Sequence, residues 1–362
     1  MRSKAVPPVD NAVCERVPLT TITGVPRGGG APDEGRTIVK RTFLAATLAA
    51  GLVVTAGATS AFAQDWPSKP VHILIGFGAG GGTDVATRIL ADGLSETLGQ
   101  QFVVENRPGA GGTIAGGIAA KAPKDGYNLL AISMGHSVSA VMVKQVPYDA
   151  VKDFEPVGIF TNSAFVVVVP KNSPATNIKS LVEYVNKQPG KLNYSTVGLG
   201  STQHLIAEHM RQRASINAQA VSYRTTGEVV SALLRGDAAY AVELYHPIRG
   251  QVDSGDLRII AVATPTRWPA IPNVPTLAES GVTGIAYLGW YGLVFPAGTP
   301  KPIVDKLHKA MQQVLSKDAV KKRLEGIGAV ANLSSPAEFG KVIQSDIKTF
   351  QDVAKSAGLE AK

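Results

Sequence analysis

The feature that most constrains the fold is a glycine-rich loop between an apolar segment and a segment of helical spacing. Residues 71–82 read VHILIGFGAGGG, and Thr83 and Asp84 follow directly. This order predicts a buried strand, a loop with few side chains, and the start of a helix. The first N–H groups of a helix lack partners within it, and the helix dipole makes that end positive. We therefore expect the loop to bind an anion through main-chain N–H groups.

Strands and helices alternate along much of the remaining chain. Further strands are predicted at residues 102–104, 127–132, 165–169, 192–195 and 238–244, and further helices at residues 85–98, 113–120, 176–186, 203–212, 227–234, 302–315 and 336–354. The order of strand, glycine loop and helix recurs at residues 192–212. The alternation predicts an α/β fold of two lobes with mainly parallel sheets. Such sheets bind ligands beyond the carboxyl ends of their strands, so a cleft is expected between the lobes.

Residues 39–63 have the composition of a secretory signal peptide. A Lys-Arg pair precedes an uncharged, Ala-rich stretch, and Ala63 completes a small-x-small cleavage motif. The apolar stretch is shorter than the roughly 20 residues that a membrane-spanning helix needs. We expect cleavage after Ala63 and a mature protein in the periplasm. Residues 1–38 are rich in Pro and Gly and lack periodicity, so an untranslated or disordered extension is expected there.

The composition excludes several classes of function. The only cysteine, Cys14, lies in that extension, so the mature chain is expected to have no disulfide and no catalytic thiol. The six histidines are scattered and form no cluster with acids, so neither a metal site nor a cofactor is predicted. The formal net charge of +8 includes no basic run, which argues against nucleic acid and favours a small anionic ligand.

An alternative interpretation of the first glycine loop is a dinucleotide site. Gly76, Gly78 and Gly81 match the G-x-G-x-x-G fingerprint, and Glu105 ends the next predicted strand, where such folds have a ribose-binding acid. Three points weigh against it: NAD is scarce outside the cytoplasm, Asp84 would crowd a pyrophosphate, and Glu105 leads into a turn. An exported NAD-dependent oxidoreductase remains the alternative function. A hydrolase using His204 is less favoured, because no G-x-S-x-G motif accompanies it.

Polar side chains near the loops are candidates for ligand contacts. Asp84 is expected to cap the first helix or to accept a hydrogen bond from the ligand. The hydroxyls of Ser201 and Thr202 are expected to cap the second helix or to bind a carboxylate. His204 lies near the positive end of that helix, so its neutral form is expected to contact the ligand. Glu243 ends a predicted strand, where it is expected to bind a cationic group or to restrict the ligand's charge.

Eight motifs in order carry a resemblance to a known family. They are WPSKPV from Trp66, FGAGGGTD from Phe77, VVENRPGAGG from Val103, PKDGY from Pro123, VPYDAVKDF from Val146, GLGSTQH from Gly198, PNVPTLAESG from Pro272 and GLVFPAGTP from Gly292. Through these motifs, residues 65–360 resemble the Bug or TctC-like periplasmic receptors of tripartite tricarboxylate transporters. The resemblance covers nearly all of the expected mature chain.

The resemblance implies a periplasmic solute-binding protein with a type 2, Venus flytrap fold. Lobe 1 is expected to comprise residues 65–163 and 287–362, and lobe 2 residues 164–286. The ligand would be a di- or tricarboxylate, an acidic amino acid or an aromatic acid, passed to the transporter's membrane subunits by a monomeric receptor without catalysis. A periplasmic sensor subunit is a further alternative. The expected ligand-binding residues are Phe77, Gly78, Ala79, Gly81, Gly82, Asp84, Gly200, Ser201, Thr202, His204, Glu243 and Tyr245.

Two segments depart from the pattern of that family. Relatives usually have Pro at one or more of positions 76, 78 and 79, where Gly76, Gly78 and Ala79 make the loop of this chain looser. Relatives commonly have Asp and Asn where this chain has Glu243 and Leu244, and a smaller or Pro-containing segment in place of Tyr245 and His246. The longer acidic side chain of Glu243 and the two large side chains that follow predict that this wall of the pocket differs in shape from that of relatives. We therefore expect the departure to affect the choice of ligand and not the fold.

Overall fold

The computed structural model describes residues 66–361 of the chain. The predicted extension, signal peptide and cleavage site lie outside the described residues. Within the described residues, no helix combines the length and the apolar character needed to cross a membrane.

The described residues form one sheet of ten strands. These are β1 (Val71–Ile75), β2 (Phe102–Asn106), β3 (Asn128–Ser133), β4 (Phe154–Pro170), β5 (Asn193–Val197), β6 (Gln219–Tyr223), β7 (Tyr240–Leu244), β8 (Leu257–Val262), β9 (Leu288–Pro296) and β10 (Ala329–Ala331). They follow the order β2-β1-β3-β9-β4-β7-β5-β6, and β8 and β10 each pair with β4. The strands that carry glycine loops are parallel to their neighbours, whereas β4, β8, β9 and β10 pair antiparallel. The sheet is therefore mixed, and the predicted mainly parallel pairing holds only around β1 and β5.

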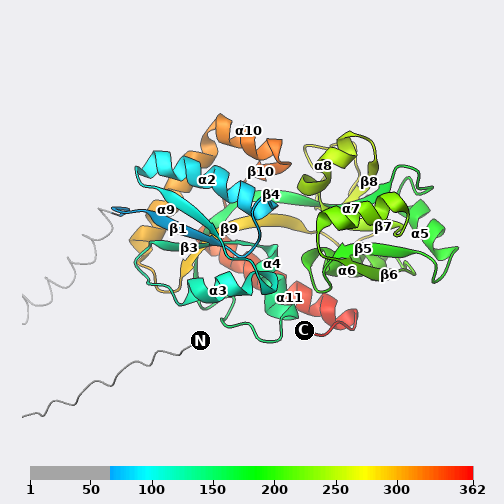
Figure 1. Cartoon of the computed structure of the whole chain (residues 1–362), viewed down its shortest axis with the longest axis horizontal. Helices are drawn as coiled ribbons and strands as arrows, with labels where there is room; N and C mark the ends of the chain where they lie inside the picture. The colour runs from blue at the N-terminus through cyan, green and yellow to red at the C-terminus, as the bar shows by residue number, and fades with distance from the viewer. Residues whose placement is uncertain (1–65, 362) are drawn as a thin grey trace, which may run out of the picture. The chain divides into compact units, whose positions relative to one another are not determined.

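Strand β4 belongs to two regions of this sheet (Figure 1). Its first part pairs with β9 as far as Ala164, opposite Leu288. From Phe165, opposite Leu244, it pairs with β7 instead. We call β1, β2, β3, β9, β10 and the first part of β4 the first sheet region, and β5 to β8 with the rest of β4 the second sheet region. Because β4 is shared, a ligand lying beside its midpoint can contact both.

Ten helices and one 3-10 turn accompany the strands in the described residues. They are α2 (Gly82–Leu98), η1 (Ala110–Gly112), α3 (Thr113–Ala120), α4 (Met134–Met142), α5 (Ile178–Asn186), α6 (Thr202–Arg213), α7 (Thr226–Arg235), α8 (Tyr245–Asp253), α9 (Lys301–Ser316), α10 (Asp318–Gly326) and α11 (Pro336–Ser356). Each of α2, α4, α6 and α8 begins within a few residues of a strand's carboxyl end. This places the positive ends of these helices at the edge of the sheet where α/β folds bind ligands.

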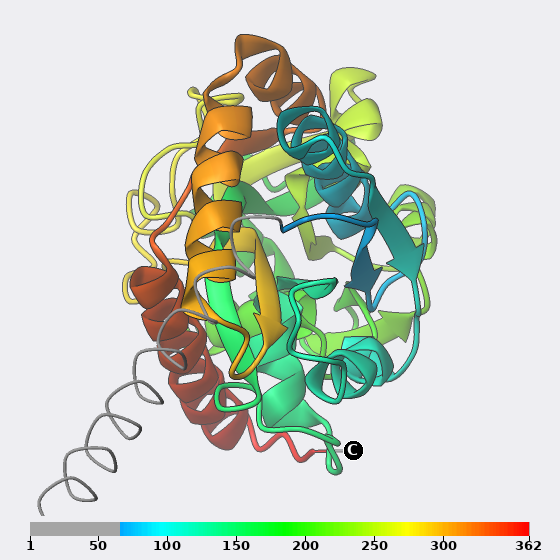
Figure 2. The same ribbon diagram turned by 90° about the vertical axis from the view of Figure 1, so that its left-hand side faces the viewer.

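Apolar side chains at strand and helix spacing build the core beneath this edge. Ile73 and Ile75 on β1 are fully buried against Leu90 and Leu94, which lie one turn apart on α2. Figure 2 shows α9 (orange) beside β4 (green), with Leu307 in the same core. Complete burial of one such side chain contributes about 1.5–3 kcal/mol to folding. The helix starts above this packed layer are therefore held in fixed positions.

The predicted elements missed the helices α4, α8 and α10 and the strands β6, β9 and β10. Two of these helices, α4 and α8, directly follow a strand. Helix α4 begins directly after β3, where Ser133 is the N-cap and its Oγ accepts a hydrogen bond from the Gly135 N–H at 3.2 Å. Helix α8 begins after β7 with Leu244 as its N-cap and contains Pro247. Both helices are only nine residues long. Glycine or proline in so short a helix interrupts the periodic apolar pattern by which helices are recognised.

Candidate functional site

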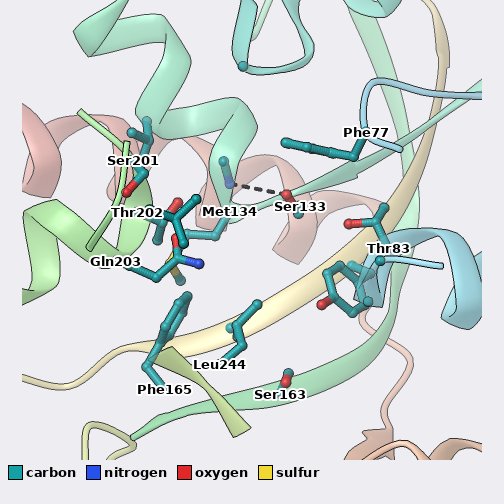
Figure 3. A pocket seen from close by; sticks show the side chains of 18 of the residues that line it. Phe77, Thr83, Ser133, Met134, Ser163, Phe165, Ser201, Thr202, Gln203 and Leu244 are labelled. Atoms are coloured by element: carbon teal, nitrogen blue, oxygen red, sulfur yellow. Dashed lines mark hydrogen bonds between the residues drawn. The ribbon is translucent and has the colours of Figure 1, made fainter. Parts of the chain in front are cut away.

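A cavity of about 360 Å³ lies where the two sheet regions meet (Figure 3). From the first region it is lined by the glycine loop after β1 and by Ser133, Met134 and Gly135 at the start of α4. From the second region it is lined by the loop after β5 and by the starts of α7 and α8. Its volume falls in the range of about 300–1,000 Å³ that is typical of small-molecule sites.

Five helix N-termini converge on this cavity. The lining includes Gly81, Ser133, Ser201 and Leu244, which are the N-caps of α2, α4, α6 and α8, and Thr226, the first residue of α7. None of the lining residues is charged. Helix dipoles therefore supply the positive potential in the cavity, and main-chain N–H groups and hydroxyls supply the donors that an anion needs.

Asp84 fixes the first glycine loop and does not line the cavity. Its Oδ2 accepts from the Gly80 N–H at 2.9 Å, and its Oδ1 accepts from Arg88 Nε at 3.0 Å and Asn106 Nδ2 at 2.9 Å. Burial raises the pKa of this carboxyl, but these bonds outweigh burial and lower it overall. The expectation that Asp84 caps the helix is wrong, because Gly81 is the N-cap of α2.

Close contacts between main-chain segments shape the same loop. A Cβ atom on Gly76 would lie only 2.5 Å from Cα of Gly112, in the second glycine cluster. A Cβ atom on Gly82 would overlap the hydroxyl of Tyr291, on β9. Only glycine permits these approaches. The glycines therefore bring the loops and β9 together around one end of the cavity.

The second loop is fixed by Ser201 and His204. Ser201 Oγ accepts from the His204 N–H at 3.2 Å, and His204 Nδ1 accepts from the Gly200 N–H at 3.1 Å. Because Nδ1 acts as an acceptor, it carries no proton. The His204 ring is buried and stacks against Tyr194 behind the loop. His204 therefore shapes the loop, and Thr202 and the N-cap Ser201 line the cavity.

Glu243 lies wholly buried behind the cavity wall. Its Oε2 accepts from Thr226 Oγ1 at 3.3 Å, and Thr226 and Gln203 line the cavity in front of it. Burial raises the pKa of Glu243 to about 7, against the opposing effects of Gln203, Thr226 and the Leu244 main chain. The carboxyl acts on the cavity through neighbouring polar groups and does not form part of its surface.

Two aromatic residues of β9 also line the cavity. Trp290 Nε1 donates to Asp346 Oδ2 on α11 at 2.8 Å, which fixes the indole ring. Burial raises the pKa of Asp346 to about 6, and this hydrogen bond lowers it in part. Tyr291 is buried beside the start of α2. The aromatic pair thus forms a rigid, apolar part of the wall.

The twelve residues expected from the sequence divide into two groups in the structure. Those that line the cavity are Phe77, Gly81, Gly82, Gly200, Ser201 and Thr202; those that do not are Gly78, Ala79, Asp84, His204, Glu243 and Tyr245. Gly78 and Ala79 are exposed on the loop. Tyr245 is buried in the core of the second sheet region, close to Gly328. Asp84, His204 and Glu243 form a layer behind the lining.

Sequence reasoning missed several lining residues. Ser133 and Gly135 carried a usable signal, since a Ser directly after a predicted strand often caps a helix. Gln203 and Thr226 also line the cavity in the first turns of predicted helices. Ser163 and Phe165 lie within β4, where the strand passes from one sheet region to the other. No local sequence pattern marks the point at which β4 leaves one sheet region and enters the other. Within the described residues, no group of three or more His, Cys, Asp or Glu could hold a metal ion.

Glu243 makes stability depend on pH. Its pKa is raised from an ordinary value of 4.5 to about 7, so the folded protein binds this proton more tightly than the unfolded chain. Ionisation of Glu243 therefore lowers the free energy of unfolding as pH rises from 4.5 to about 7, by about 3 kcal/mol in total. When pH is raised from about 4 to about 8, we expect the free energy of unfolding of the Glu243→Gln variant to increase by this amount relative to that of the unchanged protein.

Urea unfolding at both pH values measures the difference. Glu183→Gln, which alters an exposed acid on α5, is the control. A Glu243→Gln variant whose stability follows that of the unchanged protein at every pH would contradict the assignment.

The chain is similar to one protein family and to several solved structures. Residues 86–359 match the family described as TctC, tripartite tricarboxylate transporter family receptor. The solved structure of R. palustris Rpa4515 with adipate is 32% identical, with a TM-score of 0.76, and the match covers 82% of this chain and 100% of that one. The periplasmic binding protein BugD is also 32% identical, with a TM-score of 0.72 and coverage of 82% and 100%.

A third solved structure is MatC (Rpa3494) from Rhodopseudomonas palustris with bound malate. It is 29% identical, with a TM-score of 0.71 and coverage of 80% of this chain and 99% of that one. Together these structures confirm the predicted α/β fold of two lobes, and the family match confirms the resemblance inferred from the eight motifs.

Proposed function

The chain belongs to the TctC family of tripartite tricarboxylate transporter receptors, and from that premise we propose that it is a periplasmic solute-binding protein for a small carboxylate. It delivers the carboxylate to the membrane subunits of a transporter, acts as a monomer and catalyses no reaction. The observation that carries the proposal is the convergence of five helix N-termini on a cavity whose lining residues are all uncharged. A carboxylate suits such a site, because main-chain N–H groups stabilise its charge without a cationic side chain.

Relatives support the ligand class. Two similar solved structures, Rpa4515 with adipate and MatC with bound malate, have dicarboxylates as ligands. The similarity to BugD, a periplasmic binding protein, supports a periplasmic location, together with the signal peptide predicted at residues 39–63. The ligand-binding residues we propose are those expected residues that line the cavity: Phe77, Gly81, Gly82, Gly200, Ser201 and Thr202.

The rival interpretation, an NAD-dependent oxidoreductase, finds less support in the first glycine loop. The acid expected to bind ribose, Glu105, accepts from His72 Nδ1 at 2.6 Å and pairs with Arg107 at 3.1 Å. Its pKa is lowered by the His72 and Arg107 bonds, which outweigh burial. An acid engaged by two side chains of its own protein is poorly placed to bind a ribose hydroxyl.

We also propose that lobe 1, residues 65–163 and 287–362, closes on lobe 2, residues 164–286, by bending where β4 passes between the sheet regions and where the chain returns to lobe 1 just before β9. A ligand that contacts both lobes only when they are together favours the closed state by that difference in affinity. Helices α8 and α10 then form a contact between the lobes. Arg249 Nη1 donates to the main-chain oxygens of Gly326 at 3.1 Å and Glu325 at 3.3 Å, at the negative end of α10.

Arg249→Ala is expected to weaken ligand binding about fivefold, although Arg249 does not line the cavity. The reason is that only the closed state loses the charge-assisted contact with α10, whereas the Arg249–Asp253 ion pair within α8 is lost from both states. Isothermal titration calorimetry measures the change. Arg224→Ala is the matched control, because the Arg224 ion pair with Glu228 lies within lobe 2. Equal affinities of both variants would argue against the α8–α10 contact as part of closure.

The proposed function is tested by calorimetric titration of residues 64–362, refolded to remove any carried ligand. Small carboxylates, matched neutral amides and NAD are added in separate experiments. We expect binding of at least one carboxylate with a 1:1 stoichiometry and no binding of its amide or of NAD. Binding of NAD, or the absence of binding by every carboxylate, would contradict the proposal.

A further inference from the structure

We propose that the site binds its carboxylate together with a proton, which the side chain of Glu243 takes up from the solution. This inference rests on the proposed function and deepens it, because it names a second ligand of the same site. It follows from the burial of Glu243, from its hydrogen-bond partners, and from the place of those partners in the cavity wall.

Glu243 is a buried acid with too few partners for its charged form. The residue is 0% exposed, and its Oε1 has no hydrogen-bond partner among the described residues. Its Oε2 accepts a hydrogen bond from Thr226 Oγ1 at the long distance of 3.3 Å. An ionised carboxyl group in such surroundings is costly, so burial favours the protonated, neutral form.

The elements around Glu243 present no charged side chain to it in the part of the chain that the structure describes. Strand β4 places Val166 opposite Glu243, α6 contributes Gln203 and α7 contributes Thr226. Tyr240, three residues earlier on β7, lies on the other face of that strand, where it stacks on Tyr194. The titratable side chains of α6, α7 and α8 are engaged elsewhere: His204 by Gly200, Glu208 and Arg211 by each other, His209 by Tyr287, Arg213 by Thr283, Glu228 by Arg224, Arg235 by Asp237, His246 by Ile327, Arg249 by Gly326 and Asp253, and Tyr245 by packing near Gly328. No counter-ion therefore offsets the effect of burial.

Thr226 and Gln203 separate Glu243 from the ligand. Both line the cavity, in the first turns of α7 and α6, and Figure 3 shows the Gln203 side chain reaching into it. The Gln203 side chain also interacts with the Glu243 carboxyl. Because the cavity measures only about 360 Å³, a charge within it interacts with Glu243 through this layer of polar side chains. A bound carboxylate and an ionised Glu243 would therefore repel each other while they share the positive potential of the same helix starts.

Protonation of Glu243 also changes what Thr226 offers to the ligand. A hydroxyl group has one proton to donate. While Glu243 is ionised, Thr226 donates that proton to Oε2 and turns only lone pairs toward the cavity. Once Glu243 is protonated, its own O–H can donate to Thr226 Oγ1, and the Thr226 proton is then available to a ligand carboxylate. The proton comes from the solution and stays on Glu243, so no covalent bond of the ligand changes.

Binding of the carboxylate and binding of the proton therefore favour each other. Burial gives Glu243 a pKa of about 7 in the free protein, and an anion in the cavity raises this pKa further. By linkage, the affinity for the carboxylate falls as pH rises from the pKa of the free protein to that of the complex. At lower pH Glu243 is protonated with and without ligand, and the affinity no longer depends on its proton.

Calorimetric titration of residues 64–362 at several pH values tests the inference. Adipate, malate, hexanoate and benzoate are compared at pH 7, and the acid that binds most tightly is the probe. These acids are ionised at pH 7 and above, so the ligand itself takes up no proton. We expect the affinity at pH 9 to be about tenfold lower than at pH 7. Titrations at pH 7.5 in Tris and in HEPES, whose enthalpies of ionisation differ, should report uptake of about half a proton for each bound ligand.

Three variants locate the proton. Glu243→Gln keeps the shape and has no ionisable group, so we expect its affinity to change less than about twofold between pH 7 and pH 9, with no proton uptake. Glu183→Gln, in which the acid is exposed on α5, is the matched control and should retain both effects. Asp346→Asn removes the other acid of raised pKa, about 6, whose partner Trp290 lines the cavity. Since Asp346 is already ionised at pH 7.5, this variant should also retain the proton uptake.

The outcomes separate this inference from the proposed function. An affinity that does not change between pH 7 and pH 9, without proton uptake, overturns the inference and leaves the carboxylate receptor in place. Proton uptake that persists in folded Glu243→Gln also overturns it, because the proton then binds elsewhere. Absence of binding by every carboxylate at every pH contradicts the proposed function and this inference with it.

Discussion

Gly76→Ala is expected to lower the free energy of unfolding by about 3 kcal/mol and to abolish ligand binding. The new Cβ would lie 2.5 Å from Cα and 2.9 Å from the main-chain oxygen of Gly112, so the two glycine loops could not remain in contact. Because the Gly112 atoms belong to the main chain, they cannot rotate away from the new Cβ as the end of a flexible side chain could. Separation of the loops would move Phe77 and the start of α2 away from the cavity. Urea unfolding and calorimetric titration measure the two effects.

Gly78→Ala is the matched control two residues along the same loop. An added Cβ at Gly78 would have no neighbouring atom within 4 Å, and the residue is exposed. We expect its stability to stay within about 0.5 kcal/mol of the unchanged protein and its ligand affinity to be retained. A stable, ligand-binding Gly76→Ala variant would contradict the close approach of the two loops.

Joint replacement of Ser201 and Thr202 with alanine is expected to weaken carboxylate binding about 100-fold. Both residues line the cavity at the start of α6, and hydroxyl bonds to a charged ligand are stronger than bonds between neutral groups. Ser201 is also the N-cap of α6, so a loss of about 1 kcal/mol in stability is expected as well. Calorimetry measures the affinity, and thermal unfolding followed by circular dichroism checks that the variant folds.

The control for this pair removes a Ser and a Thr hydroxyl from helix surfaces away from the cavity. Ser231 donates to the Gly227 oxygen on α7 and Thr349 donates to the Ser345 oxygen on α11, both at 2.9 Å. Replacing these two residues with alanine is expected to leave affinity unchanged. If the Ser201 and Thr202 double variant also binds normally, the second loop is not part of the site.

The fold could be predicted from the sequence where one local pattern decides one element. The apolar run of β1, the glycine loop and the spacing of α2 are all local, and the predicted helices at residues 302–315 and 336–354 lie within α9 and α11. The passage of β4 between two sheet regions is not local. It depends on β9 and β7, whose residues lie more than 60 positions along the chain.

The candidate site, too, could be predicted from the sequence only in part. Phe77, Gly82 and Thr202 line the cavity as expected, because loops at the carboxyl ends of strands meet at one edge of the sheet. Asp84, His204 and Glu243 carry the right chemistry, but each is engaged by its own protein behind the lining. Whether a polar side chain faces a ligand or supports a loop depends on which way it points, and residue spacing alone does not fix that.

We expect a ligand carboxylate to lie at the helix starts that converge on the cavity, among them those of α2 and α6. A crystal structure with the acid that binds most tightly in the titrations tests it directly. We expect the carboxylate within hydrogen-bonding distance of main-chain N–H groups near Gly82 and Thr202. A carboxylate that contacts no helix start, or a ligand outside this cavity, would contradict this expectation.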